Sequence, residues 1–151
     1  MEDIKKIRLM ESILHQILAP QLKPVKYHLG LLFFRVAVAT QLLVVHGLKK
    51  LQPIHGAPEV PNPFGWPADV NHCIALAGSL YFPIFIILGL LTRLAALPAL
   101  AVTATGYFIV HAGEPAALRD IPFMYSICLL LIALLGAGRY SIDYLLFKES
   151  E

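Results

Sequence analysis

Four apolar runs separated by short polar segments dominate the chain. They cover residues 28–47, 71–91, 94–110 and 121–135, and Pro83 interrupts the second. A helix of about 20 apolar residues is long enough to cross the hydrocarbon core of a bilayer. The last two runs are near the short limit, so their helices are expected to extend into the flanking residues. The pattern therefore predicts four membrane-spanning helices.

The segments around these runs predict three kinds of connection. Residues 1–26 carry apolar side chains at helical spacing and basic side chains largely off that face, which predicts an interfacial amphipathic helix ended by Pro20. Residues 51–70 contain enough proline and glycine to exclude a regular helix, so we expect a structured Pro-rich loop between the first two spans. The second and third spans are almost contiguous, which predicts an antiparallel hairpin with Thr92 as the N-cap.

Composition agrees with an all-α four-helix transmembrane bundle, and it limits the partners. Of the 151 residues, 58% are hydrophobic, and the mean hydropathy of +0.70 is far above that of a soluble domain. The lipid bilayer is therefore the first partner. A formal net charge of only +2, without a basic face, excludes nucleic acid as a partner. The two cysteines, Cys73 and Cys128, are far apart in apolar segments and form no redox or zinc motif.

Lysine and arginine are distributed unequally between the two sides of the predicted bundle. Cytoplasmic loops of membrane proteins carry the excess of these residues. We therefore predict that both termini are cytoplasmic and that residues 51–70 and 111–120 face the opposite side. The side with the termini holds Lys5, Lys6, Arg8, Lys23, Lys26, Arg93, Arg139 and Lys148, and the other holds Lys49, Lys50 and Arg119.

Polar side chains within the spans suggest a binding site. On the first span Arg35, His46 and Lys49 occupy one helical face. Near the outer ends of the spans we expect a common polar interior formed by His46, His72, His111, Glu114, Arg119 and Asp120. Because ionisable residues within a membrane span are costly and mark functional sites, the candidate ligand-binding residues are Arg35, His46, His72, His111 and Asp120.

Each of these residues also has a plainer interpretation. His72 can be a hydrated histidine at a helix end, and Arg35, Lys49 and Lys50 can extend to the lipid headgroups. The spacing of His111 and Glu114 would suit two metal ligands, but the spans contain almost no carboxylates, so the residues do not favour a metal. No catalytic residue is selected, because Cys128 has no partner for thiol chemistry.

Several stretches together resemble the DoxX family of small four-span bacterial membrane proteins. The resemblance extends from about residue 30 to residue 145. Each stretch is loose by itself, but their order and spacing are fairly specific. They are Leu-Phe-Phe-Arg at residues 32–35, His-Gly-Leu-Lys-Lys-Leu at 46–51, Leu-Gly-Leu-Leu-Thr-Arg-Leu-Ala-Ala at 88–96, His111, and Gly-Ala-Gly-Arg-Tyr-Ser-Ile-Asp at 136–143.

The interfacial helix predicted at residues 1–26 is then followed by a DoxX-like four-helix transmembrane domain at residues 27–151, and the resemblance implies the bacterial inner membrane. It also implies roles for Arg35, for His46 and for Asp120. The family usually has a glutamate early in the second span, where this chain offers Ser79 or its neighbours, so Arg35 lacks its expected partner. The 136–143 tail is expected to be structural, with glycines ending the fourth helix and a serine capping a short amphipathic helix.

Three functions remain open from the sequence. The resemblance implies an accessory or anchoring subunit of a quinone-linked oxidoreductase, with a quinone headgroup near His46 or His111 and with Asp120 exchanging protons. The alternative is a non-catalytic structural or assembly protein, whose Pro-rich loop with Phe64 and Trp66 docks on a partner. A solute or proton pathway is the third, and it would need a homo-oligomer because four spans enclose little lumen.

Overall fold

The computed structural model describes residues 5, 8, 24–51 and 60–147. The amphipathic helix predicted for residues 1–26 falls almost entirely outside the described residues, as does much of the Pro-rich loop. Regular structure in the described part is entirely helical. Its four membrane-length helices confirm the predicted bundle, and they cover Pro24–Leu51, Ala68–Leu88, Thr92–Val110 and Ala116–Leu135.

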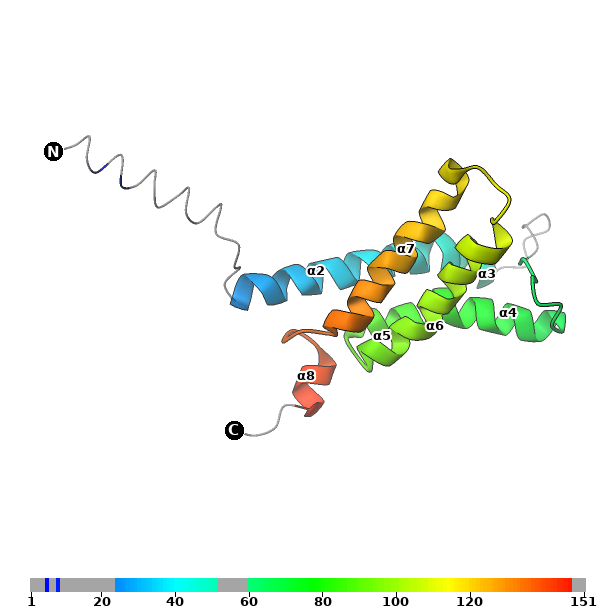
Figure 1. The fold of residues 1–151 in the computed structure, drawn as a ribbon. Helices are drawn as coiled ribbons and strands as arrows, with labels where there is room; N and C mark the ends of the chain where they lie inside the picture. The colour runs from blue at the N-terminus through cyan, green and yellow to red at the C-terminus, as the bar shows by residue number, and fades with distance from the viewer. Residues whose placement is uncertain (1–4, 6–7, 9–23, 52–59, 148–151) are drawn as a thin grey trace.

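Three of the four spans combine α-helix with one π-helical turn, whereas the fourth is regular. A π turn holds one residue more than an α turn, so it shifts the side chains that follow it around the helix axis. The π turns η1 and η3 lie toward the ends of their spans that are away from α8, and η2 lies at the middle of the second span. The labelled α-helices are shown in Figure 1. The elements are α2 (Pro24–Leu42), η1 (Leu43–Gly47) and α3 (Leu48–Leu51); α4 (Ala68–Leu76), η2 (Ala77–Tyr81) and α5 (Phe82–Leu88); α6 (Thr92–Thr105) and η3 (Gly106–Val110); and α7 (Ala116–Leu135) followed by α8 (Ile142–Phe147).

The spans are antiparallel in sequence order, and each packs on the next, with α2 also against α7 (Figure 1). Small residues on α6 let its neighbours approach closely, as is common between membrane helices. The buried core consists of Ala39, Leu42, Ile86, Ala95, Ala96, Ala99, Leu129 and Ile132. The two ends of the bundle are named by their connections. The α8 end contains the turn at residues 89–91 and α8, and the loop end contains residues 60–67 and 111–115.

Pro83 does not break the second span. It lies in the first turn of α5, directly after the π turn η2. Proline has no backbone N–H to donate, and the helix continues through this position without that hydrogen bond. In an α-helix that N–H would bond the carbonyl of Ser79. Gly47 of the first span packs directly against this carbonyl, where any Cβ would collide with it. The first two spans thus touch backbone to backbone at the level of their π turns.

The hairpin between the second and third spans is confirmed, but its predicted cap is wrong. Thr92 is the first helical residue of α6 rather than its N-cap, and Leu91 before it has a positive φ of 47°. The carboxylate of Asp143 accepts hydrogen bonds from the backbone N–H of Leu91 at 2.6 Å and of Thr92 at 2.9 Å. The side chain of Asp143, distant in sequence, therefore caps the start of α6 in place of Thr92.

The segment after α7 has the predicted form. Gly136, with a φ of 79°, ends the helix. Ser141 accepts a hydrogen bond from the backbone N–H of Tyr144 at 3.1 Å, which confirms it as the cap of α8. The backbone N–H of Asp143 also donates to the carbonyl of Gly89 at 2.8 Å. These bonds fix α8 beneath the hairpin of the second and third spans.

Candidate ligand-binding cavity

A cavity of about 680 Å³ lies at the loop end, between the four spans and beneath residues 60–66. This volume is in the range of small-molecule sites, which are mostly apolar with a few polar groups. Most of the lining is aliphatic, proline or aromatic. The polar and aromatic members whose roles are considered below are His46, Lys50, Trp66, Asn71, Ser79, Thr103, His111 and Tyr125.

The π turns account for much of the cavity wall. Residues of η1, η2 and η3 all line it, and such turns are frequent at functional sites. Along the first span, the buried side reads Leu31, Arg35, Ala39 and Leu42 at α-helical steps, then continues at Gly47, five residues on. The extra residue turns Lys50 toward the cavity and leaves Lys49 exposed.

Lys50 is the charged side chain of the cavity wall. Its ammonium donates a hydrogen bond to the Ser79 hydroxyl at 2.9 Å. That hydroxyl in turn donates to the carbonyl of Ala75, one helical turn earlier on the second span. Ser79 is 1% exposed, so the acceptor of the lysine is fixed in position. The prediction that Lys50 extends to the lipid headgroups is therefore wrong, because its head group points between the spans.

His46 lies one turn before Lys50 on the same wall of the cavity. Its ring meets that of Tyr125 from α7 edge to face, with 5.4 Å between the ring centroids. Within the described residues, the imidazole nitrogens have no hydrogen-bond partner, so both are available to a ligand. Further in, the hydroxyl of Thr103 accepts a hydrogen bond from Ser126 at 3.1 Å. The polar groups thus continue from the mouth toward the centre of the bundle.

Residues 60–67 cover part of the cavity mouth. The amide of Asn71 donates to the carbonyls of Val60 and Pro61, at 3.4 and 3.1 Å, and holds this segment over the second span. Phe64 and Trp66 stack with 4.9 Å between their ring centroids, and both line the cavity. Both rings are also exposed, by 50% and 43%. The cover is therefore aromatic on both its inner and its outer side.

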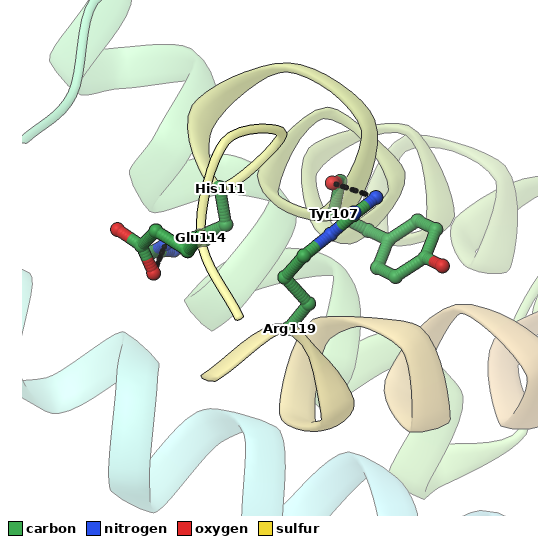
Figure 2. Close-up of polar contacts among 4 residues, drawn as sticks. All are labelled: Tyr107, His111, Glu114 and Arg119. Carbon is green, nitrogen blue, oxygen red and sulfur yellow. Dashed lines mark hydrogen bonds and ion pairs between the residues drawn. The ribbon is translucent and has the colours of Figure 1, made fainter. Parts of the chain in front are cut away.

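The connection between the third and fourth spans carries a second group of polar contacts at the loop end (Figure 2). His111 lines the cavity and pairs through Nδ1 with the carboxylate of Glu114 at 2.8 Å. Arg119 donates to the backbone carbonyl of Tyr107 at 3.4 Å, and its guanidinium lies 4.4 Å from the centre of the Tyr107 ring. These contacts hold the start of α7 against η3, and His111 keeps its other ring nitrogen, Nε2, for a ligand.

The structure separates the five predicted ligand-binding residues into three groups. His46 and His111 both line the cavity. His72 and Asp120 lie at the same end but are exposed and outside the lining. Arg35 lies at the α8 end, about 16 Å from His46 along the helix at 1.5 Å per residue. The expected common interior therefore contains two histidines, with Lys50 and Tyr125 in place of the other members.

Arg35 has a structural setting of its own. It is 1% exposed, and its Nη2 donates to the carbonyl of Tyr140 at 2.6 Å. Its guanidinium packs so closely under Gly89 that a Cβ there would collide with Nη1. Asp143 supplies the nearby negative charge. The negative charge that the second span does not provide thus comes from α8, while the hydrogen-bond acceptor comes from Tyr140 just before it.

Two cavity residues were missed in the sequence for identifiable reasons. Lys50 follows His46 by four residues, which places both on one face of any helix, but the pair of adjacent lysines at a helix end is also typical of interfacial anchors. Tyr125 has no polar neighbour in sequence. For a metal, the described residues offer no cluster of three or more His, Cys, Asp or Glu side chains. The cavity wall offers instead hydrogen-bond donors above an apolar interior.

Comparison of the sequence with known protein families gives a match. The family model described as DoxX matches residues 30–112, which is more than half of the chain. The chain belongs to the DoxX family. The matched region includes His46, Lys50, Ser79 and His111, but not Tyr125 or Asp143. Membership agrees with the four apolar spans and makes this a multi-pass membrane protein.

A curated relative adds sequence similarity without a function. An uncharacterized protein from Haemophilus influenzae (strain ATCC 51907 / DSM 11121 / KW20 / Rd) is 34% identical to this chain over 93 residues. The alignment covers 58% of this chain and 62% of the relative, so it spans less than two thirds of that protein. No solved structure matches the chain.

Proposed function

We propose that this DoxX protein is a membrane subunit of a quinone-linked oxidoreductase assembly and that it holds a quinone headgroup in the cavity at the loop end. The observation that carries the proposal is an apolar cavity of about 680 Å³ with His46 and Lys50 on one wall. A quinone is an apolar ring with two carbonyl acceptors. Its ring and tail fit aliphatic and aromatic walls, and its carbonyls need the donors that this wall supplies.

The role proposed for this chain is binding and orientation. A quinone carries the redox chemistry itself, while the protein fixes its position and its hydrogen bonds. His46 would donate to one carbonyl, with Tyr125 holding the imidazole from the other side. His111 lies across the mouth as the second candidate donor. Electrons would come from a partner subunit, which we propose docks on the loop end.

The proposed orientation follows from the charge distribution. With both termini in the cytoplasm of the bacterial inner membrane, the loop end faces the opposite side. The cavity mouth, residues 60–67 and residues 111–115 would then be open to a periplasmic partner. The quinone tail would leave the cavity between the apolar spans and extend into the bilayer.

Binding can be measured directly through the single tryptophan, because Trp66 lines the cavity and quinones quench tryptophan fluorescence. Purified protein in mild detergent would be titrated with menadione, a short neutral naphthoquinone. We expect saturable quenching. Loss of the His46 hydrogen bond in His46→Ala should weaken binding by about fivefold to tenfold, since a net hydrogen bond contributes about 1 kcal/mol.

The matched control is His72→Ala, which removes the same side chain from the same end of the bundle but outside the cavity. It should leave the menadione titration unchanged. Equal effects of the two substitutions, or quenching that never saturates, would contradict the quinone site. Mass spectrometry of the native complex would identify any oxidoreductase subunit that co-purifies, and none being present would contradict the subunit assignment.

A structural role is the second candidate, and the exposed aromatic pair favours it. Phe64 and Trp66 stack on the outer surface of the loop end, where a partner or the lipid interface would cover them. In that case Phe64→Ser should release a co-purifying partner, while His46→Ala should not. The two substitutions therefore separate an assembly surface from a ligand site.

A further inference from the structure

The positive charge of Lys50 has no protein counterion among the described residues. Among residues 24–51 and 60–147, the lining of the cavity contains no Asp or Glu. The one ion pair of the described residues, between His111 and Glu114, does not involve Lys50. An ammonium has three donors, and here one is used by Ser79. Two donors of the ammonium are thus left for a ligand at the cavity wall.

In the part of the chain that the structure describes, the groups that face this ammonium do not neutralise it. On its own helix the nearest is His46, which adds positive charge if protonated. From η2 comes the neutral hydroxyl of Ser79, from α7 the neutral phenol of Tyr125, and across the mouth lies His111. Between spans, an unpaired charge is costly and marks a site for a charge of opposite sign. The cavity is therefore electropositive at its mouth and apolar at its centre.

We infer that Lys50 makes this cavity selective for amphipathic molecules with an anionic headgroup, so that a negatively charged ring or head is bound in preference to its neutral counterpart. The inference rests on the proposed function for its first ligand, a quinone in an anionic form. The same chemistry is available to an anionic phospholipid. Charge-assisted hydrogen bonds are roughly twice as strong as neutral ones, so an anionic ligand should bind more tightly than its neutral counterpart.

Two matched naphthoquinones test the preference. Menadione is neutral, whereas lawsone carries a hydroxyl in place of the methyl group and is an anion at neutral pH. Their affinities would be measured by Trp66 quenching in wild type, in two neutral variants, Lys50→Gln and Lys50→Met, and in Lys50→Arg. Lys49→Met is the control, because this adjacent lysine is exposed and outside the cavity. Taking the lawsone-to-menadione ratio in each variant cancels the partitioning of each probe into detergent.

We expect that ratio to fall by about tenfold in Lys50→Gln and Lys50→Met, and to stay at the wild-type value in Lys49→Met and Lys50→Arg. An unchanged ratio in the neutral variants would overturn the inference. If menadione still bound in a His46-dependent manner, the proposed quinone site would stand without it. The two neutral variants differ in polarity, so a folding defect in one does not remove the test.

A lipid arm distinguishes the two sources of an anionic headgroup. Wild type and Lys50→Gln would be placed in nanodiscs of equal phosphatidylglycerol and phosphatidylcholine content, and the retained lipid identified by native mass spectrometry. If neither quinone binds and phosphatidylglycerol is retained in wild type but not in Lys50→Gln, the inference holds and the quinone function fails. If neither quinone binds and the lipids are retained equally, both proposals are wrong.

Discussion

Lys49 and Lys50 are adjacent and chemically identical, yet only Lys50 lies in the cavity wall. The regular helical spacing from Arg35 through His46 predicts Lys49 on the polar face. The π turn η1 adds one residue between Leu42 and Gly47, and the face moves from Lys49 to Lys50. A lysine near His46 on the cavity wall could be predicted from the sequence, but the choice between Lys49 and Lys50 could not. Both follow His46 at helical spacing, and a π turn depends on packing between spans rather than on local propensity.

Gly47 is the residue on which this packing depends. We expect Gly47→Ala to destabilise the protein by about 1–3 kcal/mol, because the new methyl group would collide with the backbone carbonyl of Ser79 rather than with a movable side chain. The midpoint of thermal unfolding in detergent, followed by far-UV circular dichroism, would fall. Menadione binding should weaken as well, since Ser79 also positions Lys50.

The control for this substitution is Gly30→Ala, on the same helix. A Cβ at Gly30 meets no atom within 4 Å, and alanine is the better helix former. Its unfolding midpoint should be unchanged or slightly higher. A similar loss in both variants would mean that the close approach of the first two spans is not what makes Gly47 necessary.

Among the elements, α6 shows how a helix start can depend on a residue far away in the chain. Its first backbone donors are bonded by Asp143, 51 residues from Thr92. Sequence patterns describe caps within one turn of the helix start, so Thr92 was the reasonable candidate. The distant cap arises because α8 folds back beneath the hairpin at residues 89–91. The same fold brings Tyr140 and Asp143 to Arg35, which has no carboxylate partner on the second span.

We expect Asp143→Asn to lower stability by about 1–2 kcal/mol, because the amide keeps one acceptor of the two and loses the charge near Arg35. Thermal unfolding in detergent would measure this loss. Asp120→Asn, at an exposed position, should stay within about 0.5 kcal/mol of wild type. If the two variants unfolded at the same temperature, the cap at the start of α6 would contribute no stability.

At the scale of the whole molecule, the number of spans and the hairpin could be predicted from hydropathy and the short connection alone. Hydropathy works this well because the bilayer leaves few alternatives to a membrane-length helix. Which polar residues contact one another was harder to predict from the sequence. Arg35 and His46 share a face of one helix, but they serve opposite ends of the bundle, and only the packing of α8 reveals this.

The orientation of the bundle can be tested with two introduced cysteines in a Cys73→Ser background. Ala112→Cys lies in the exposed connection at the loop end, and Leu145→Cys lies on α8, where the leucine is 77% exposed. In intact spheroplasts we expect a membrane-impermeant maleimide to label Ala112→Cys but not Leu145→Cys. Labelling of both after lysis is the control for reactivity. The reverse pattern would place the cavity mouth on the cytoplasmic side.

The π turn at Leu43–Gly47 also has a consequence for evolution. A lineage that lost one residue from this turn would recover a regular helix, and the lysine that follows the turn would keep its place in the cavity wall while its position number fell by one. Two homologues could then present the same ammonium to a ligand from positions that no ungapped alignment would pair. Comparison of cavity residues across the family therefore requires a gap to be allowed inside the first membrane span.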